Sequence, residues 1–363
     1  MTRALPALAA AGAIFMTSAA WAPGSSAAPN GGSGPGETPA SIEAALGFLA
    51  ARTSAFGLVD SFVEDEAALA YTYDNAMAAL ARVSAGELGA AAAIFDAYAV
   101  IGAEDGGGFL HRYGAEDGGA AGGLPGVGHN AYLLLALALY HLESGDGRFD
   151  AMALGLADHL LDHQDLDGGL FGRAGVTWKS TENNLAAYRA LNTLGRLFAR
   201  ADLLDAADRI RAFLERECWD GTRFLTGEND PSIVTDAQAL GALVLGPGFA
   251  GGAFWVEGHT LATRRYYRGR RVTGFDLDTD RDAVWTEGTL QQALAFAEAG
   301  DAARAAGYRQ EAEKLVLSSG GFWQASNPGS TGFGDTFQRW QAAAPTAWYV
   351  LAAGQDNVFA PLP

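Results

Sequence analysis

The fold is indicated by one stretch of the chain, Gly128-His-Asn-Ala-Tyr-Leu-Leu-Leu-Ala-Leu-Ala-Leu-Tyr140, where polar residues lead directly into a helix of apolar side chains. Similar stretches recur along the sequence, each with one polar residue that marks its start. The markers are separated by 56, 53, 53, 51 and 59 positions, and they are Asp74, Asn130, Asn183, Asp236, Glu287 and Thr346. A period of this length indicates one supersecondary unit whose copies stack, because none can bury its apolar face alone.

The repeating unit is predicted to be a pair of helices. The helix that begins at Asn130 is apolar on every face, so it needs neighbours on all sides. The helices between the marked ones are amphipathic, as residues 205–217 and 302–315 show, so one of their faces meets solvent. The sequence therefore predicts an all-α fold, an (α/α)6 toroid in which six inner helices are ringed by six outer ones.

The connections between the helices differ in length, and this difference predicts where a pocket lies. Inner helices pass to outer helices through short polar turns such as 84–87 and 144–147. Outer helices return through longer Gly-rich segments that are typical of short β-hairpins. These segments are 105–109, 167–170, 220–224, 268–272 and 320–323. We expect them to form one rim, an active-site rim where the N-termini of the inner helices and the polar markers meet.

The N-terminal region is predicted to direct export. Residues 1–28 read as a signal peptide, and 29–40 as a linker rich in Gly, Ser and Pro. The toroid is expected over 41–354, followed by a C-terminal tail, 355–363. No later apolar run reaches the roughly 18 residues of a membrane span. We therefore expect a secreted or periplasmic protein whose mature chain does not insert into a membrane.

The composition limits the classes of ligand that the protein is expected to bind. The formal net charge of −18 argues against nucleic acid and against polyanionic substrates, which would be repelled. Neutral or cationic ligands remain. Cys218 is the single cysteine, so the monomer has no disulfide, and a monomer is what we expect. The sequence predicts no cofactor, and we assign no residue as a metal ligand.

Two charged runs have alternative interpretations. Five arginines fall within the eight residues 264–271, either on a solvated rim hairpin or as a group that holds an anionic substituent. In Asp276-Leu-Asp-Thr-Asp-Arg-Asp-Ala-Val-Trp-Thr-Glu287 the acids have the spacing of a calcium loop. However, Arg281 stands where such a loop normally has glycine. Calcium binding by this run stays open.

Acidic residues lie beside aromatic residues at the predicted rim. Asp74, Glu182, Asp236 and Glu287 are accompanied by Tyr71, Tyr73, Trp178, Trp285 and Trp348. Aromatic rings stack on the C–H faces of sugars, and cleavage of a glycosidic bond needs one protonated and one ionised carboxyl group. The alternative for each acid is a helix cap, since acidic residues are common in the first turn of a helix.

With these motifs in view, the chain resembles the six-hairpin glycosidase superfamily, whose (α/α)6 toroids include family 8 endoglucanases and chitosanases. The resemblance covers roughly residues 41–354. It is closest to exported bacterial members without an assigned activity, and it is carried by Tyr71-Thr-Tyr-Asp-Asn-Ala76, Trp178-Lys-Ser-Thr-Glu-Asn-Asn184 and Trp285-Thr-Glu-Gly-Thr-Leu-Gln291. The resemblance implies a carbohydrate pocket, commonly with inverting hydrolysis.

The sequence thus predicts an exported glycoside hydrolase acting on a neutral or cationic, β-linked poly- or oligosaccharide. Glu182 is assigned as general acid and Asp74 as base, with Glu287 as the alternative for either role. The remaining site residues are expected to bind substrate, by stacking or through sugar hydroxyls: Tyr71, Tyr73, His129, Asn130, Trp178, Asn183, Asp236, Trp285 and Trp348. Two other functions stay open. One is a non-catalytic glycan-binding accessory protein of exopolysaccharide assembly; the other is a lyase or sugar epimerase that would use His129 with Tyr71 or Tyr73.

Overall fold

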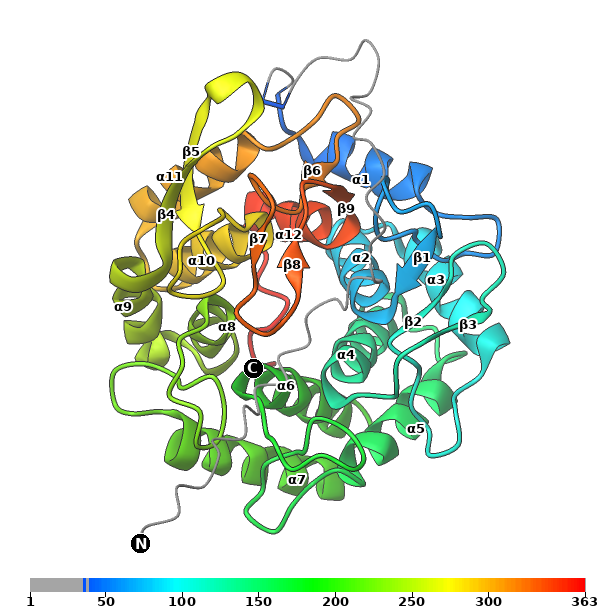
Figure 1. Ribbon diagram of the computed structural model, residues 1–363. Coiled ribbons are helices and arrows are strands. Elements are labelled where there is room, and N and C mark those ends of the chain that lie inside the picture. Colours follow the sequence, from blue (N-terminus) through cyan, green and yellow to red (C-terminus); the bar gives the residue numbers. More distant parts are fainter. Residues whose placement is uncertain (1–34, 37–38, 363) are drawn as a thin grey trace, which may run out of the picture.

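The computed structural model describes residues 35–36 and 39–362 as a closed ring of helices (Figure 1). Twelve α-helices and nine short β-strands run through these residues. The helices alternate along the chain between an outer and an inner ring. The outer helices are α1 (Ile42–Ala51), α3 (Leu88–Ile101), α5 (Asp150–Leu161), α7 (Ala201–Phe213), α9 (Gly251–Thr260) and α11 (Ala302–Glu313). The inner helices are α2 (Thr72–Ser84), α4 (Val127–Ser144), α6 (Thr181–Leu197), α8 (Thr235–Leu245), α10 (Thr286–Glu298) and α12 (Ala343–Gly354).

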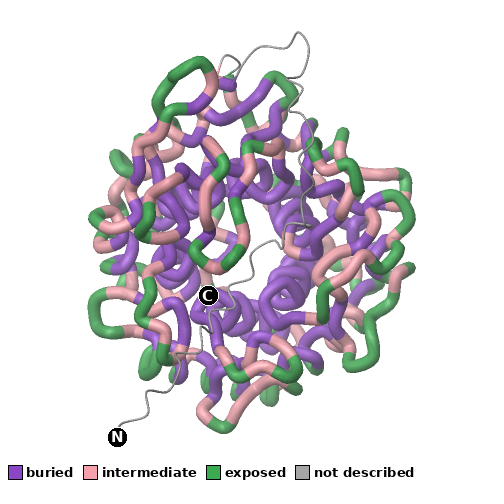
Figure 2. Tube along the Cα trace, in the orientation of Figure 1, coloured by how far each residue is buried: buried purple, intermediate pink, exposed green. Residues whose placement is uncertain are grey.

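The two rings differ in burial as their sequences predict. In α4 every residue from Val127 to Tyr140 is buried, whereas in α11 the buried residue is Ala312. Figure 2 shows the inner helices buried along their length and the exposed residues concentrated at the periphery. Each inner helix packs against the next, and α12 packs against α2, so the ring closes. The predicted (α/α)6 toroid is confirmed.

The strands belong to the connections from outer to inner helices, which we call the rim segments. β1 (Leu69–Tyr71), β2 (Arg112–Gly114) and β3 (Ala120–Gly122) form an antiparallel sheet. The other strands pair in antiparallel ribbons. They are β4 (Leu261–Arg265) with β5 (Arg271–Phe275), β6 (Phe322–Trp323) with β9 (Gln341–Ala342), and β7 (Gly329–Ser330) with β8 (Thr336–Phe337). The rim segment between α1 and α2, which turns at Gly57, is absent from the predicted set.

A side chain in the fourth position of each inner helix binds the preceding rim segment. In α4 the Phe109 N–H donates to Asn130 Oδ1 at 2.8 Å, and Asn130 Nδ2 donates to the Phe109 and Gly126 carbonyls at 3.0 and 2.8 Å. We call these residues the clamps. They are Asn75, Asn130, Asn184, Gln238, Thr289 and Thr346. They supply partners to backbone groups that would otherwise be buried and unpaired.

The clamps correct the predicted repeat markers. Asn130 and Thr346 are clamps, but the markers chosen in α2 and α6 precede the clamp by one residue, and those in α8 and α10 precede it by two. The first residue of each inner helix supplies a second link. Its backbone N–H donates to the following rim segment, as Thr72 does to the His111 carbonyl at 3.0 Å. In α12 the acceptor is Ser61 in the first rim segment, at 2.9 Å from Ala343, so these links also close the ring.

The structure bears differently on the two predicted terminal segments. The predicted signal peptide lies outside the described residues, as does most of the predicted linker. The predicted C-terminal tail is not separate from the domain. Phe359 is fully buried and stacks on Trp348 with 5.1 Å between ring centroids, and Arg189 donates to the Val358 carbonyl.

None of the helices in the described part of the chain has the length and apolar character required to cross a membrane.

Replacing a clamp tests its contribution to stability. Asn184→Ala leaves the Leu170 N–H and carbonyl without their side-chain partner, so we expect the free energy of unfolding to fall by about 2–4 kcal/mol. Urea denaturation followed by circular dichroism measures the change. The matched control is Asn192→Ala on the same helix, because Asn192 Oδ1 accepts from the Arg196 side chain rather than from backbone. Equal losses in the two variants would contradict the clamp's role.

Candidate functional site

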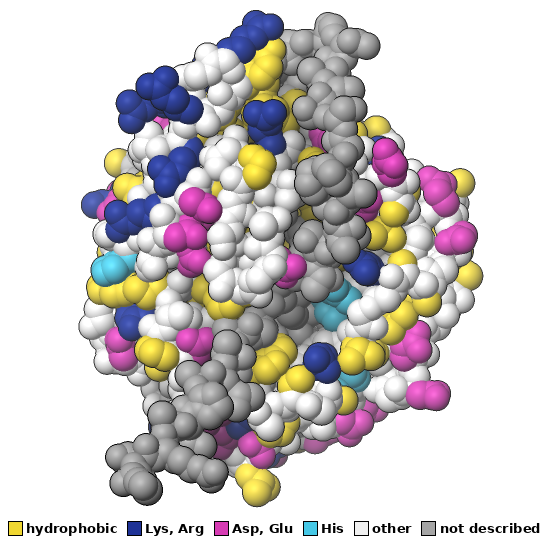
Figure 3. Space-filling view, viewed as in Figure 1, with side chains coloured by type: hydrophobic (Ala, Val, Ile, Leu, Met, Phe, Trp, Pro, Cys, Tyr) yellow, Lys and Arg dark blue, Asp and Glu magenta, His cyan; other side chains and the backbone are white. Residues whose placement is uncertain are grey.

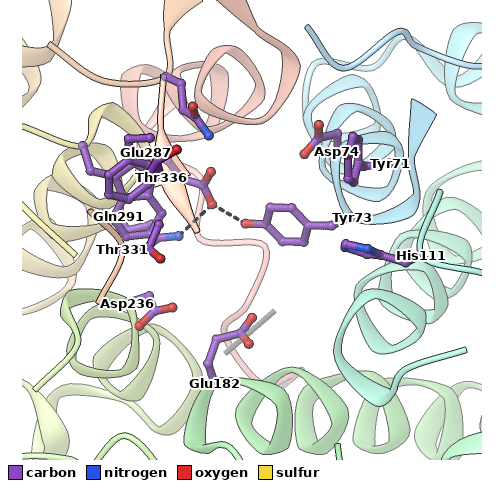
Figure 4. Close-up of a pocket in the computed structure, with 13 residues that line it drawn as sticks. Tyr71, Tyr73, Asp74, His111, Glu182, Asp236, Glu287, Gln291, Thr331 and Thr336 are labelled. Carbon is purple, nitrogen blue, oxygen red and sulfur yellow. Dashed lines mark hydrogen bonds between the residues drawn. The ribbon is translucent and has the colours of Figure 1, made fainter. Parts of the chain in front are cut away.

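The clamps set which side chains face the centre of the ring. In an α-helix, residues two positions apart lie about 200° apart around the axis. Because each clamp faces its rim segment, the residue two positions earlier points into the hollow at the inner-helix N-termini. These second-position residues are Tyr73, Gly128, Glu182, Asp236, Glu287 and Ala344. The polar ones line one pocket, where Figure 4 shows them converging from different helices.

The pocket contains many of the predicted site residues. Its lining includes Tyr71, Tyr73, Asp74, Glu182, Asp236, Trp285 and Glu287. Asp74 comes from the third position of α2, and Tyr71 and Trp285 are the residues immediately before α2 and α10. The Trp285 ring is 2% exposed and stacks on Phe337 with 5.7 Å between centroids. An aromatic wall therefore adjoins the carboxyl groups.

Glu287 is held in a hydrogen-bonded chain. The Tyr73 hydroxyl donates to Glu287 Oε1, and Gln291 Nε2 donates to the same oxygen at 3.2 Å (Figure 4). The Trp348 indole N–H in turn donates to the Tyr73 hydroxyl at 3.0 Å. Burial raises the pKa of Glu287 to about 8, and the hydrogen bond from Tyr73 offsets part of this rise. Glu287 therefore holds a proton near neutral pH.

Glu182 and Asp236 form an interacting pair from the neighbouring helices α6 and α8. Burial raises the pKa of both carboxyl groups, and the charge of Asp236 raises that of Glu182 further. A hydrogen bond from Tyr132 lowers the pKa of Glu182 in part, and the Ala237 N–H, which donates to Asp236 Oδ1 at 2.7 Å, acts likewise on Asp236. Because two like charges at one site oppose each other, the pair favours a state with at least one proton bound.

The carboxylate oxygens of Asp74 have no regular hydrogen bond among the described residues, although the Ser61 hydroxyl acts on them as a donor. Asp74 is fully buried, and burial raises its pKa to about 7, with the nearby Ser61 hydroxyl lowering it in part. Figure 4 shows Asp74 beside Tyr71, on the side of the pocket away from Glu182. Its oxygens can therefore accept hydrogen bonds from a ligand or a water molecule.

Three of the other predicted site residues do not line the pocket. Asn130 is a clamp, so its amide binds backbone rather than sugar. His129 is buried with Nε2 within hydrogen-bonding distance of Gly126 N and the Phe109 carbonyl, and burial lowers its pKa to about 3. Asn183 is buried outside the pocket lining, and no described group satisfies its amide. The structure therefore places Asn130 and His129 against backbone groups and leaves Asn183 outside the pocket lining.

The predicted tryptophan subsites also need correction. Trp348 is fully buried behind Tyr73, between that residue and Phe359, so it supports the pocket instead of lining it. Trp178 lies outside the lining and packs closely over Gly172, where any side chain would meet its ring. Trp285 is the predicted tryptophan that lies in the pocket.

Sequence reasoning missed pocket residues that come mainly from the rim: His111, Gln291, Gln324, Thr331, Thr336 and Phe337. Gln291 lies four residues after Glu287 on α10, so helical spacing could have identified it. Thr331, Thr336 and Phe337 belong to or adjoin the β7–β8 ribbon, whose fold over the ring has no short-range sequence signature. Burial lowers the pKa of His111 to about 4, so its imidazole is neutral near pH 7.

The acidic residues of the run 276–287 lie in two separate parts of the structure. Asp276, Asp278 and Asp280 place carboxylate oxygens within 4.8 Å of one another. Asp276 accepts from the Leu277 and Ala283 N–H groups, and Asp278 accepts from that of Asp280, so these acids cap turns. Glu287, the residue that would close a calcium loop, instead binds Tyr73 in the pocket. The calcium-loop spacing is therefore not realised as one set of ligands.

Solved structures share this architecture at low sequence identity. A glycosidase superposes with a TM-score of 0.67 at 16% identity, over 89% of this chain and 96% of that chain. An α-amylase from Clostridium perfringens gives 0.62 at 12% identity, over 86% and 96%. A D-mannose isomerase gives 0.64 at 12%, over 87% and 95%. No family model and no curated protein matches the sequence. The chain therefore has the (α/α)-toroid fold of these structures.

The raised pKa values predict how stability depends on pH. A Glu carboxyl titrates near 4.5 when unfolded and, at Glu287, near 8 when folded. The folded state therefore keeps a proton that the unfolded state releases. This contribution is complete below pH 4.5 and is lost as the pH rises toward 8. We expect the free energy of unfolding to fall between about pH 5 and pH 8, and to fall less steeply in Glu287→Gln.

Urea denaturation at several pH values measures this dependence. The matched control is Glu104→Gln, since Glu104 is exposed in the rim segment between α3 and α4. Its pH dependence should follow that of the wild type. A Glu287→Gln curve parallel to the wild-type curve would show that Glu287 does not carry the proton.

Proposed function

We propose that the protein is a glycoside hydrolase that cleaves a neutral or cationic, β-linked poly- or oligosaccharide with inversion. The observation that carries this proposal is the set of buried carboxyl groups facing one another across a pocket with an aromatic wall. Hydrolysis needs one acid that gives a proton to the leaving oxygen and one base that activates water. The pocket offers candidates for both.

Glu182 is proposed as the general acid. Its pKa is raised by burial and by Asp236, so the carboxyl group is protonated near neutral pH, as an acid catalyst requires. It projects from the second position of α6, where the helix fixes its direction. Protonation of the glycosidic oxygen by Glu182 would let the leaving group depart as an alcohol.

Asp74 is proposed as the base. Apart from the Ser61 hydroxyl, its oxygens lack partners among the described residues, so they can accept a hydrogen bond from water. Its position away from Glu182 supports attack by water from the opposite face of the sugar, which gives inversion. An inverting pair is expected to stand about 6.5–9.5 Å apart, against about 5–5.5 Å for a retaining pair. Glu287 is the alternative for either role, because Tyr73 can exchange a proton with it.

Charge and stacking define the substrate class. Acids lining the pocket would repel uronates and phosphates, whereas neutral hydroxyls and ammonium groups suit them. Trp285, backed by Phe337, is proposed to stack on a sugar ring. Export follows from the signal peptide proposed for residues 1–28.

A sugar isomerase or epimerase is the second candidate. It is favoured by the structural likeness to a D-mannose isomerase and by His111, a neutral imidazole in the pocket lining. Such an enzyme would move a proton between carbon atoms of one sugar and release no new reducing end. His111 replaces His129 as the candidate base, because His129 is occupied by backbone groups.

One panel distinguishes these functions. The purified protein is incubated with glucans, chitosan, xylan and free mannose, and the products are followed by reducing-end assay and ¹H NMR. New reducing ends of inverted anomeric configuration support the hydrolase. Interconversion of the free sugar supports the isomerase, and binding without any product supports the accessory role.

Glu182→Gln tests the acid. The substitution keeps the shape of the side chain and removes its transferable proton, so we expect kcat to fall by about 10²-fold or more with little change in KM. Glu104→Gln again serves as the control and should retain wild-type kcat. If the Gln variant turns over as fast as the wild type, the acid is Glu287, and Glu287→Gln is measured in the same way.

Trp285→Ala tests the stacking wall. Loss of the indole should weaken oligosaccharide binding by about 1–3 kcal/mol, as expected for a buried aromatic anchor. Calorimetry with the Glu182→Gln background avoids turnover during the measurement. The control is Trp255→Ala, since Trp255 stacks on His259 in outer helix α9. Equal affinity of both variants would assign Trp285 to packing alone.

A further inference from the structure

The β4–β5 ribbon with its tip, Tyr267–Gly269, forms a cationic projection that the proposed reaction does not use; we call residues 261–275 the arginine arm. It carries Arg264, Arg265, Arg268, Arg270 and Arg271. Figure 1 shows the arm at the periphery of the ring, and Figure 3 shows Lys and Arg side chains gathered over it on the face that is viewed. The chain as a whole is acidic, with a formal net charge of −18.

The strand register places like charges opposite each other. Arg265 pairs with Arg271, and both side chains are exposed. Because side chains alternate between faces, this pair shares the outer face with Thr263 and Thr273, whose hydroxyls are 2.9 Å apart. Like charges directly opposite each other on a sheet destabilise it. The arm therefore presents a polar, doubly cationic face at a cost to its own stability.

The surrounding protein does not neutralise this face. Among the described residues, none of the arm's arginines forms an ion pair with a carboxylate, whereas Arg148 and Arg304 elsewhere on the surface do. Arg264 donates to the Asp282 carbonyl and Arg270 to the Pro35 carbonyl. The nearby acid, Glu311, accepts from the Thr273 N–H and from Lys314. Arg265 and Arg271 are thus left to bind a ligand.

We propose that the outer face of the arginine arm binds an acidic polysaccharide through Arg265 and Arg271. Guanidinium groups bind carboxylates and phosphates in a bidentate manner, so an ordered pair suits a polymer with repeated negative groups. A membrane surface would require large apolar side chains beside the cations, and the arm exposes none among the described residues. Single-stranded nucleic acid would require open aromatic platforms, but Tyr266 is buried and Arg268 lies over the Tyr267 ring.

This site is separate from the pocket, whose acids would repel the same ligand. It would hold the protein on an anionic glycan while the pocket acts on another, neutral or cationic, saccharide. The binding does not depend on the proposed hydrolysis, so either can fail without the other.

The test measures binding of the full chain to polygalacturonate by calorimetry at low and moderate salt, with neutral dextran as a negative control. Arg265→Gln combined with Arg271→Gln should weaken binding by about 10-fold or more and reduce its salt dependence. The matched control combines Arg148→Gln with Arg216→Gln, which removes equal charge from ion-paired surface positions. Arg265→Lys combined with Arg271→Lys should keep part of the affinity, and circular dichroism should show all variants folded.

Several outcomes would overturn the proposal. Wild-type protein that does not bind polygalacturonate, or an equal loss in both double variants, shows that the arm is not a specific site. Tighter binding to phosphatidylglycerol vesicles, or to single-stranded DNA, than to polygalacturonate assigns the arm to that other partner. If the folded double variant of Arg265 and Arg271 binds polygalacturonate as tightly as the wild type, these two arginines are not part of the binding site.

Discussion

Hydrogen bonds between each inner helix and two rim segments are the constraint on which this structure depends. The fourth residue of the helix binds the segment before it, and the first backbone N–H binds the segment after it. The rim backbone is buried at these points, so leaving its polar groups unpaired would be costly. Because Ala343 donates to Ser61, the last repeat is joined to the first by the same link. The ring is thus closed by backbone bonds as well as by helix packing.

These links fix the rotation of every inner helix, and the rotation creates the site. With the fourth residue turned to the rim, the second residue must face the axis. Where that residue is Glu182, Asp236 or Glu287, a carboxyl group is held in a pocket that water screens poorly, and its pKa rises. Gly128 and Ala344 occupy the same position in α4 and α12 and leave room. The acids oppose folding when ionised, because burial disfavours their charged form.

How well the sequence predicted the site depends on this rotation. The toroid, the alternation of inner and outer helices and a rim rich in acids followed from period and apolar pattern. The sequence pattern did not show which residue of each motif faces the pocket and which one binds the rim segment. In Thr181-Glu-Asn-Asn184 the sequence offers three neighbouring polar side chains, and only rotation separates Glu182 in the pocket, Asn183 outside its lining and Asn184 on the rim. A shift of one residue turns a side chain by about 100°, so a marker chosen one or two positions away confuses a pocket-lining residue with a clamp.

The sequence by itself determined the number of repeats, which helices are buried on all sides, and the acidic residues near one end of the ring. These are properties of composition and period, which act locally along the chain. The tertiary structure decided which side chains meet. Tyr73 bonds Glu287 from across the ring, Trp348 lies behind Tyr73, and Phe337 folds over Trp285. These pairs are distant in sequence, so no local pattern encodes them; they follow from closure of the ring and from the path of the rim segments over it.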